Sequence, residues 1–583
     1  MRSAFHHSKI GTFFQAEPRL GNPYAGDQFL QRLLKRLLPA EIFADIHSDL
    51  MRLGKRIEDE IDPLGIECEM NPPSLNQTDP WGKRLDEVVT SRAWKRMKDI
   101  SAEEGIVASG YERKYGEYSR IHQFAKCLIF HPSSGLYSCP LAMTDGAAKT
   151  LEVLKLPQYN EVYSRLTSRD PSKFWSSGQW MTERRGGSDV ANGTETVAVK
   201  QTDGSYKLFG YKWFSSATDA DISLTLARIV DDKGHAQEGS SGLSMFLLKT
   251  RKEDGSLNNI HVMKLKNKLG TRSLPTGELL LDSTDAELLS EPGRGVACIS
   301  NMLNITRLHN TTGSISAMRR VILLARDYSM KRSCFGSKIS EYPLHIDTLA
   351  DMELECRAGT VLLFELVRFL GLQEAGKATE EEELIFRLLT PVAKLFTAKR
   401  SMGVVSEGLE CFGGQGYIED TGIPAILRNN QVTPIWEGTT NVLSLDMLRA
   451  VAKSRGKAFL SLQSALTRRL GNVVEKRKDL QPACDRLLKE METLIEMASK
   501  FEVSEAMARA RIIAFAVGEI ASGMLLLEQA VDTESPTDLH AARRWIKNVT
   551  DVQKKLTEAD PVESTNSFDM VFDGYLGTPN SKL

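Results

Sequence analysis

Hydrophobic and polar residues alternate with two different periods along the chain, and the change of period divides it into regions. From about residue 30 to 175, apolar residues recur every three or four positions, as in DQFLQRLLKRLL and FADIHSDLMRLGKRI. This spacing places apolar side chains on one face of a helix, so the region is predicted to be mostly helical. The stretch NPPSLNQTDPWG interrupts it, and its prolines and Asx residues predict a loop.

The period shortens near residue 180, where alternating apolar and polar residues predict β-strands. TETVAVKQTDGSYKLFGYKWF forms two such runs around Asp203-Gly204, a dipeptide typical of tight hairpins. DISLTLARIV, GLSMFLLKT and TGELLLDSTDAELL are further strand candidates. A small β domain is therefore predicted, and SEPGRGV is interpreted as the linker that follows it.

Helical spacing returns from about residue 296 and continues almost to the end of the chain. RRVILLARDYSMKR is amphipathic, and TEEEELIFRLL begins with Thr379 as a cap, followed by glutamates that suit the positive end of the helix dipole. Pro391 is expected to end that helix so that a second one begins. CFGGQGY is expected to stop the second helix with its glycines, and a polar tail is expected from about residue 558.

Together these patterns predict an α+β protein of four parts. A helical domain with an N-terminal extension covers 1–177, and the β domain covers 178–292. A helical bundle covers 293–454, and an additional helical domain with a polar tail covers 455–583. A chain of 583 residues is long enough to build several hydrophobic cores.

Composition restricts the class of function. The chain is 41% hydrophobic and 26% charged with a net charge of −2, so no global charge attracts nucleic acid or an anionic membrane. Residues 451–583 hold 19 basic and 19 acidic side chains, which is not the basic surface of a nucleic-acid-binding domain. No run approaches the 18 apolar residues of a transmembrane helix. Eight scattered cysteines without a CxxC pair indicate a reducing, intracellular compartment.

Both ends of the sequence carry features of targeting signals. The residues before Glu17 include Arg2 and Lys9 but no acidic side chain, which is faintly similar to a mitochondrial transit peptide. A disordered start is the alternative interpretation. The sequence ends in Ser581-Lys582-Leu583, a tripeptide that peroxisomal import receptors read. We therefore expect a peroxisomal protein, with a mitochondrial location as the alternative.

QWMTERRGGSDVANGT, residues 179–194, is the stretch richest in candidate chemistry. The glycines of its GGSD segment allow a close approach of the backbone to a ligand, and consecutive backbone N–H groups can bind a pyrophosphate. GGSD is also a good turn, so this segment alone leaves both interpretations open. The G-x-G-x-x-G signature is absent and the region is rich in β-strands, which argues against a Rossmann site.

Glu437 is the single carboxylate of TPIWEGTTNVL, a stretch otherwise apolar, small or hydroxylated that leads into a predicted helix. The simple interpretation is a solvated loop glutamate. The alternative is a general base, which has to be held in a dry site. The glutamate run 380–383 is interpreted as a solvated helix start, and no metal site is predicted.

Six segments, in this order, resemble the acyl-CoA dehydrogenase superfamily of flavoproteins. They are WMTERRGGSDV, GYKWFSSA, KLGTRSLPTGELLLD, RLHNTTGSISAMRRVILLARDYSMKRSCFGSKI, GLECFGGQGYIED and IWEGTTNVLSLDMLR. The double arginine before GGSD, KWF, RLLTPVAKLFTAKR and the helical extension after 450 are most similar to the AidB-like branch. The resemblance implies an N-terminal helical domain, a middle β-barrel-like domain and a C-terminal helical bundle, here followed by an extra helical domain.

The resemblance implies FAD as the cofactor. Thr182 would bond the isoalloxazine edge, Ser188 would lie near the pyrophosphate and the thioester, and Ser216 matches a hydroxyl near flavin N5. Phe214 stands where the family usually has tryptophan. The full set of implied cofactor contacts is Gln179, Trp180, Met181, Thr182, Glu183, Gly187, Ser188, Phe214, Ser215, Ser216, Arg332, Phe335, Glu410, Gly413, Gly414, Thr439 and Asn441.

Some of these contacts imply an oligomer. Arg332 and Phe335, in RSCFG, match residues that reach the FAD of a neighbouring subunit. The resemblance therefore implies a homotetramer built as a dimer of dimers, and closed symmetry is common among homo-oligomers. Glu410 and Asn441 stand where the family usually has glutamines.

The resemblance places Glu437 at the position of the catalytic base. The base removes a proton alpha to the thioester carbonyl while a hydride leaves the beta carbon for flavin N5. In the family, the backbone N–H of the base residue and a flavin hydroxyl hold the carbonyl oxygen. Some relatives carry the base just before the substrate-side arginine, where this chain has Thr306. The implied substrate contacts are Ser188, Asn304, Arg307 and Gly438, with Arg307 holding the CoA portion.

The resulting hypothesis is α,β-dehydrogenation of a medium- or long-chain fatty acyl-CoA to trans-2-enoyl-CoA, with an electron-transfer flavoprotein as one candidate acceptor. An acyl-CoA oxidase that reduces O₂ is one alternative, which the peroxisomal tripeptide favours. A flavoprotein that binds or sequesters acyl-CoA or fatty acid with little turnover is the other. The sequence leaves the acyl chain length and the electron acceptor open.

Overall fold

The computed structural model describes residues 13–559 and 561–575. The chain divides into two compact units. The first comprises Met1–Thr360 and Thr397–Glu437, and the second comprises Val361–Phe396 and Gly438–Leu583. The transit-like N-terminal residues and Ser581-Lys582-Leu583 lie outside the described residues, so the two targeting signals stay predictions. The predicted domain boundaries also stay predictions.

The N-terminal part of the first unit is helical, as its 3.6-residue period predicts. Its α-helices are α2 (Gln28–Leu37), α3 (Ala40–Arg56), α4 (Asp62–Met70), α5 (Arg92–Glu103), α6 (Ala108–Tyr111), α7 (Ser119–Phe130), α8 (Ser138–Leu154) and α9 (Asn160–Leu166). Short turns accompany them at η1 (Ile57–Ile61), η2 (Gly116–Tyr118), η3 (His131–Ser133) and η4 (Pro157–Tyr159). The side chain of Asp27 caps α2 by accepting a hydrogen bond from the backbone N–H of Leu30 at 2.9 Å.

The proline-rich stretch that was predicted to be a loop forms most of a β-hairpin instead. β1 (Ser74–Thr78) pairs antiparallel with β2 (Arg84–Val89). The side chain of Gln77 donates hydrogen bonds to the carbonyls of Val262 and Met263, at 3.3 and 3.1 Å. Pairing with β2 and these contacts stabilise the hairpin, and neither can be predicted from the prolines of the turn.

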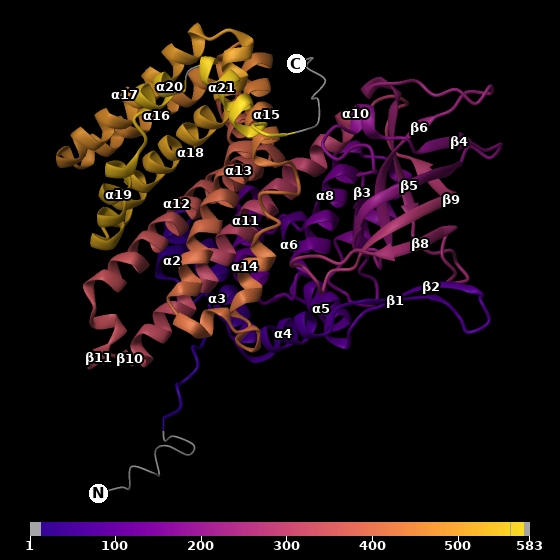
Figure 1. The fold of residues 1–583 in the computed structure, drawn as a ribbon, viewed down its shortest axis with the longest axis horizontal. Helices are drawn as coiled ribbons and strands as arrows, with labels where there is room; N and C mark the ends of the chain where they lie inside the picture. The colour runs from indigo at the N-terminus through magenta and orange to yellow at the C-terminus, as the bar shows by residue number, and fades with distance from the viewer. Residues whose placement is uncertain (1–12, 560, 576–583) are drawn as a thin grey trace, which may run out of the picture. The chain divides into compact units, whose positions relative to one another are not determined.

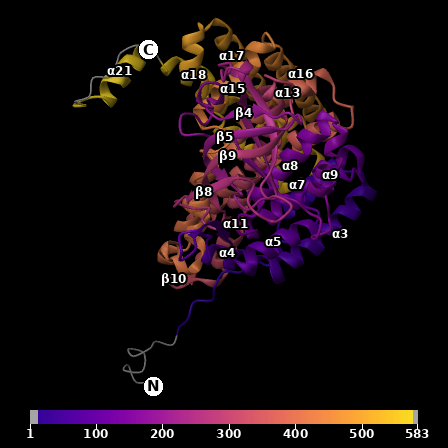
Figure 2. The ribbon, with the colours of Figure 1, turned by 90° about the vertical axis from the view of Figure 1, so that its right-hand side faces the viewer.

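The β domain is a closed barrel. Its strands are β3 (Ser177–Trp180), β4 (Val197–Lys200), β5 (Tyr206–Ser216), β6 (Ile222–Ile229), β7 (Leu243–Lys249), β8 (Ile260–Leu265) and β9 (Thr276–Leu288), with α10 (Val190–Gly193) and η5 (Ser240–Gly242) in its connections. β6 pairs with both β4 and β7, and β4, β5, β9 and β7 complete the ring. Figure 2 views this domain face on, with β4, β5, β9 and β8 side by side. This confirms the predicted β-barrel-like domain.

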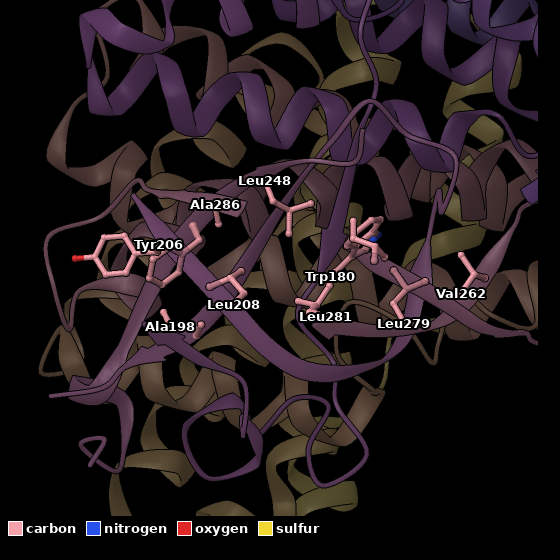
Figure 3. Packing of buried hydrophobic residues seen from close by; sticks show 12 residues of the cluster. Trp180, Ala198, Tyr206, Leu208, Leu248, Val262, Leu279, Leu281 and Ala286 are labelled. Atoms are coloured by element: carbon pink, nitrogen blue, oxygen red, sulfur yellow. The ribbon is translucent and has the colours of Figure 1, made fainter. Parts of the chain in front are cut away.

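Trp180 fills the centre of the barrel core. It is 1% exposed and lies among aliphatic side chains that include Leu279 and Leu281, as Figure 3 shows. Its indole N–H donates to the carbonyl of Ser216 at 3.1 Å, which satisfies its one polar atom. The side chain of Trp180 is therefore a structural element of the barrel, and the residues beside it are held in fixed positions.

A buried ion pair lies inside the same domain. Lys212 Nζ is 2.7 Å from Glu183 Oε1, and both side chains are almost completely buried. Burial alone would raise the pKa of Glu183, but Lys212 and a hydrogen bond from Thr196 Oγ1, at 2.6 Å, outweigh it and hold the pKa low. Lys212 also donates to the carbonyl of Leu226 at 3.0 Å. These contacts therefore hold the carboxylate of Glu183 inside the barrel.

α11 (Gly295–Lys331) is buried despite a polar sequence. The hydroxyls of Thr312 and Ser314 donate to the carbonyls one turn earlier, at 2.9 and 3.1 Å, so they need no outside partner. Gly313 leaves room for His131, because a Cβ there would lie 2.8 Å from the imidazole. The helix therefore packs closely against its neighbours while carrying polar side chains into the interior.

The remaining elements of the bundle follow α11. They are β10 (Ser333–Cys334), β11 (Ser337–Lys338), η6 (Ile339–Glu341), α12 (Pro343–Glu374), α13 (Glu380–Glu410), η7 (Gly413–Tyr417), η8 (Glu419–Thr421) and α14 (Ile423–Asn430). Thr379 caps α13 as predicted, with Thr379 Oγ1 accepting from the N–H of Glu382 at 3.2 Å. The predicted break at Pro391 is wrong, because α13 continues through it. Buried Leu388, Leu389 and Val392 continue the apolar face on both sides of the proline.

The second unit is helical. It contains α15 (Thr440–Lys453), α16 (Lys457–Lys476), η9 (Lys478–Leu480), α17 (Gln481–Lys500), α18 (Val503–Thr533), α19 (Pro536–Asn548), α20 (Val552–Glu558) and α21 (Pro561–Val571), as well as parts of α12 and α13. Arg469 joins α12 to α18 by pairing with Glu365 and Glu528, each at 2.5 Å. The predicted extra helical domain is confirmed, although the predicted polar tail includes one more helix.

Among the described residues, α18 is the one helix long and apolar enough to cross a membrane, judged by length and composition alone. Of its most apolar 18-residue stretch, 83% is buried inside the structure. α15, α16, α17 and α19 pack against it. α18 is therefore the core helix of the second unit. Its burial explains why it is more apolar than the sequence pattern predicted.

We expect Lys212→Met to lower the free energy of unfolding of the β domain by about 3–5 kcal/mol, because it leaves the buried Glu183 carboxylate unpaired. Adding Glu183→Gln should recover part of this loss. Lys207→Met is the matched control, since Lys207 lies on the same strand and pairs with the half-exposed Asp285, a pair worth about 0–1 kcal/mol. Calorimetry measures the unfolding midpoints; an unchanged midpoint for Lys212→Met would contradict the prediction.

Candidate active site

Glu437 lies in a tight loop that follows α14. Its backbone is left-handed with φ of 55°, and Gly438 has φ of 99°. Glycine suits its position because it adopts such angles without steric cost. Thr439 then caps α15. The loop reverses the chain within a few residues, so the Glu437 side chain is set by backbone geometry as well as by its contacts.

α11 anchors this loop at two positions one helical turn apart. Thr306 Oγ1 donates to Glu437 Oε2 at 2.6 Å. Asn310 Nδ2 donates to the carbonyl of Thr433 at 3.3 Å, and the indole N–H of Trp436 donates to Asn310 Oδ1. The i, i+4 spacing of Thr306 and Asn310 places both on one face of the helix. The structure thus brings together the two positions at which members of the family carry the base.

The Glu437 carboxylate is half-buried, and Thr306 is its one hydrogen-bond partner among the described residues. Within the same part of the chain, no basic side chain pairs with it, and its backbone N–H donates to no other group. A carboxylate with a free side and a free N–H beside it suits both predicted tasks, proton removal and holding a carbonyl oxygen. Ile435, two residues before Glu437, is 56% exposed.

The residues predicted to line the flavin meet at the end of β3 and in the loop after it. Gln179 is half-buried, Met181 is buried, and the backbone carbonyl of Thr182 accepts from the N–H of Trp213 at 2.9 Å. Gln179 Oε1 and Ser215 Oγ are buried oxygens that have no hydrogen-bond partner within the described residues. Buried polar atoms are normally satisfied, so these two oxygens fit a site that a polar cofactor completes.

The GGSD segment is an exposed turn. The backbone N–H groups of Glu183 and Gly186 each donate to the other's carbonyl, at 3.1 and 3.3 Å. Gly187 and Ser188 are exposed, and a Cβ on Gly187 would meet only Thr182, at 3.9 Å. The segment therefore has room for a ligand close to its backbone, which fits the predicted pyrophosphate contact.

Phe214 and Ser216 lie on β5, near the turn after β3. Phe214 is 54% exposed and its ring lies 5.0 Å from Lys266 Nζ. Ser216 Oγ lies 3.0 Å from Thr276 Oγ1, directly across the β5–β9 pair. Thr276 Oγ1 in turn accepts from Lys268 Nζ at 2.9 Å. An exposed aromatic ring beside a half-buried hydroxyl fits the predicted contacts with the flavin ring.

The predicted inter-subunit contacts lie elsewhere in the first unit. The β10–β11 hairpin that carries Phe335 is at the lower left in Figure 1, at the opposite end from the barrel at the right. Phe335 is 98% exposed with φ of 48°. Arg332 is half-buried at the base of this hairpin. Glu410, Gly413 and Gly414 are exposed at the end of α13. One chain therefore does not bring these residues to the Thr182 region of the same chain.

The remaining predicted residues divide between the two units. Asn304 and Arg307 lie half-buried on α11, in the same helix as Thr306. In the second unit, Lys394 Nζ donates to the carbonyl of Gly438 at 2.6 Å, and Asn441 Oδ1 accepts from Arg511 at 3.3 Å. Thr439 is exposed. The roles of these residues stay predictions.

Across residues 13–559 and 561–575, no group of three or more His, Cys, Asp or Glu side chains is arranged to hold a metal ion. The eight cysteines are free thiols.

Comparison with known proteins gives a consistent result along the whole chain. The family profiles that match are "Adaptive response protein AidB N-terminal domain" (17–170), "Acyl-CoA dehydrogenase, middle domain" (178–284), "Acyl-CoA dehydrogenase, C-terminal domain" (293–452) and "Acyl-CoA dehydrogenase 11 C-terminal domain-like" (457–572). Acyl-CoA dehydrogenase family member 11 of Caenorhabditis elegans is 48% identical and covers 99% of this chain and 96% of its own length. The chain belongs to the acyl-CoA dehydrogenase family. By family it is an FAD-dependent oxidoreductase, and the predicted fold class is confirmed.

Two further relatives locate the chain within the family. AidB of Escherichia coli is 33% identical and covers 67% of this chain and 72% of its own length. The crystal structure of Caenorhabditis elegans ACDH-11 in complex with C11-CoA superposes with a TM-score of 0.94 at 47% identity, and covers 99% of this chain and 100% of that one. The predicted resemblance to the AidB-like branch is confirmed.

Sequence reasoning missed the residues that support the site. Asn310 anchors the Glu437 loop, and Thr276 and Lys268 extend the contact of Ser216. The i, i+4 spacing of Asn310 from Thr306 is a usable signal in the sequence. Thr276 and Lys268 carry no such signal. The contact of Thr276 with Ser216 depends on the register between β5 and β9, and that of Lys268 depends on the conformation of the β8–β9 loop.

We expect Thr306→Val to slow flavin reduction by acyl-CoA by about tenfold to a hundredfold, since a hydrogen bond to a charged group is worth about 1.5–3 kcal/mol. The carboxylate would lose the contact that fixes its orientation. Anaerobic stopped-flow absorbance measures the rate, and saturation with substrate separates binding from the reduction step. Thr306→Ser is the control that keeps the hydroxyl. Equal rates for the valine and serine variants would contradict a positioning role.

Proposed function

We propose that the chain catalyses FAD-dependent α,β-dehydrogenation of a medium- or long-chain fatty acyl-CoA to the trans-2-enoyl-CoA. The observation that carries this proposal is the half-buried Glu437 carboxylate, which Thr306 holds at 2.6 Å. A carboxylate in this state can accept a proton, whereas one paired with a lysine or arginine would be a poorer base.

Different residues carry out different parts of the proposed reaction. Glu437 accepts the proton alpha to the thioester carbonyl, while its unpaired backbone N–H is available to the carbonyl oxygen, where negative charge develops. Gln179, Thr182, Ser188, Phe214, Ser215 and Ser216 would hold FAD, which would supply the acceptor for the hydride of the beta carbon. Asn304, Arg307 and Gly438 are the substrate-side contacts in this proposal.

The preference for medium or long acyl chains rests on a relative. The C11-CoA in the Caenorhabditis elegans structure is an acyl-CoA of intermediate length, bound to a protein 47% identical to this chain over 99% of it. Anaerobic titration of the purified protein with acyl-CoAs of graded length tests the proposal. Loss of the flavin's visible absorbance with chains near this length supports it, and no loss with any length overturns it.

Two alternatives are outcomes of the same titration. A shifted flavin spectrum without bleaching indicates an acyl-CoA-binding flavoprotein with little turnover. Bleaching followed by rapid return of the colour when O₂ is admitted indicates an acyl-CoA oxidase, whereas slow return indicates a dehydrogenase that requires an electron-transfer flavoprotein.

We expect Glu437→Gln to bind FAD and acyl-CoA as the wild type does and to lose flavin reduction by at least about 10²–10⁴-fold. The amide has nearly the shape of the carboxylate, so the loop and its N–H remain, but it has little basicity. Stopped-flow bleaching and equilibrium binding measure the two properties separately. Glu407→Gln is the control, an exposed glutamate on α13. Bleaching at the wild-type rate would exclude Glu437 as the base.

We expect a homotetramer, with a mass four times the 64.9 kDa of one chain, that Phe335→Ala weakens. The almost fully exposed aromatic ring on a left-handed residue suits a contact with a second subunit. Light scattering measures the mass, and flavin fluorescence in the filtrate measures FAD release. Trp81→Ala, a 93% exposed aromatic at the tip of β1–β2, is the matched control. A monomeric wild type that holds FAD tightly would contradict the prediction.

A further inference from the structure

The side chains of Ser216, Thr276 and Lys268 form a continuous series of hydrogen bonds. Ser216 and Thr276 face each other across the β5–β9 pair with their hydroxyl oxygens 3.0 Å apart. Lys268, in the loop between β8 and β9, donates to Thr276 Oγ1 at 2.9 Å and to the carbonyl of Leu274 at 2.7 Å. The two hydroxyl-bearing residues are fixed by the sheet register, and the lysine is fixed by two acceptors.

The lysine determines which atoms donate and which accept in this series of hydrogen bonds. An ammonium group donates hydrogen bonds and accepts none, so the oxygen of Thr276 is an acceptor toward Lys268. The positive charge polarises the Thr276 hydroxyl, which makes it a stronger donor toward Ser216. The same charge disfavours a Ser216 O–H dipole aimed at Thr276. The Ser216 hydroxyl proton is therefore directed away from Thr276 and remains available to a ligand.

The environment of Lys268 keeps its charge sensitive to pH. Burial lowers the pKa of Lys268 to about 8. The titratable groups that face it are Cys139 on α8 and Glu69 on α4, and each raises the pKa of Lys268 only in its negatively charged form. Burial raises the pKa of the Cys139 thiol to about 12, so this neighbour is neutral near pH 7. Arg272 Nε donates to the backbone carbonyl of Lys268 at 3.1 Å. Lys268 is therefore mainly protonated at pH 7 and mainly neutral above pH 8.

We propose that Lys268 is a positioning residue that, through Thr276, orients the Ser216 hydroxyl as a hydrogen-bond donor toward the hydride-accepting edge of the bound flavin. The proposal rests on the proposed function, because it requires FAD beside Ser216. A hydrogen-bond donor at that edge would draw electron density from the ring and would therefore raise the flavin's affinity for electrons. A purely structural role, in which Lys268 only ties its loop to Leu274, would not change that affinity.

The test measures the two-electron midpoint potential of the flavin in the holoenzyme without substrate, by equilibration with a reference dye. We expect Lys268→Met and Thr276→Val each to shift the reduction equilibrium about tenfold toward the oxidised flavin, or about 30 mV for two electrons. The double variant should show no larger shift in the midpoint potential than either single variant, since both substitutions interrupt the same series of hydrogen bonds. The difference between wild type and Lys268→Met should shrink above about pH 8, where the wild-type lysine is neutral.

Controls separate this proposal from the one on which it rests. Lys264→Met removes an exposed lysine of β8 and should leave the potential unchanged, while Lys268→Arg keeps the charge and should keep most of the potential. A wild type that takes up no FAD overturns the proposed function itself. If the wild type binds FAD and the potentials of Lys268→Met and Thr276→Val match it at every pH, this inference alone is overturned. If Lys268→Met does not fold, the potential of Thr276→Val decides.

Discussion

The hydrogen bond between Thr306 and Glu437 is the contact on which the proposed chemistry depends. Glu437 lies in a loop with a left-handed backbone, and such a loop does not fix a side chain by its own regular structure. α11 supplies the missing rigidity, because Thr306 holds the carboxylate and Asn310 holds Thr433 and Trp436 one turn away. A general base needs a fixed position relative to the proton that it removes. The long buried helix provides that position.

The barrel fixes the positions of the residues that are proposed to hold the flavin. β5 contains one extra residue relative to β9 between Lys212 and Ser215, which is a β-bulge. Lys212 is buried with Glu183 just before the bulge, and Ser216 faces Thr276 just after it. Bulges often re-aim side chains beside active sites. Here the same strand stabilises the barrel interior with one part, and its next part carries Phe214 and Ser216, two of the residues proposed to contact the flavin.

Periodicity alone predicted the helix–β–helix order, and the six ordered segments predicted the fold family and Glu437 as the base. Predictions from local sequence signals were wrong where tertiary contacts determine the secondary structure. Pro391 does not end α13, because buried residues on both sides keep the helix packed. The β1–β2 hairpin forms despite its prolines, because Gln77 bonds to the edge of the barrel. Lys268 could not be predicted, since its contact with Thr276 depends on the conformation of the β8–β9 loop.

The apolar character of α18 has a consequence for synthesis of the protein. α18 leaves the ribosome before α19, which later covers part of it, and its partner Phe396 on α13 comes from far earlier in the chain. A Cβ at Gly518 would lie 2.9 Å from the Phe396 ring, so α18 packs closely against α13 at this point in the finished fold. Until then a stretch as apolar as a membrane span is uncovered. Correct folding of the second unit therefore depends on how quickly the nascent chain is shielded from membranes and from aggregation.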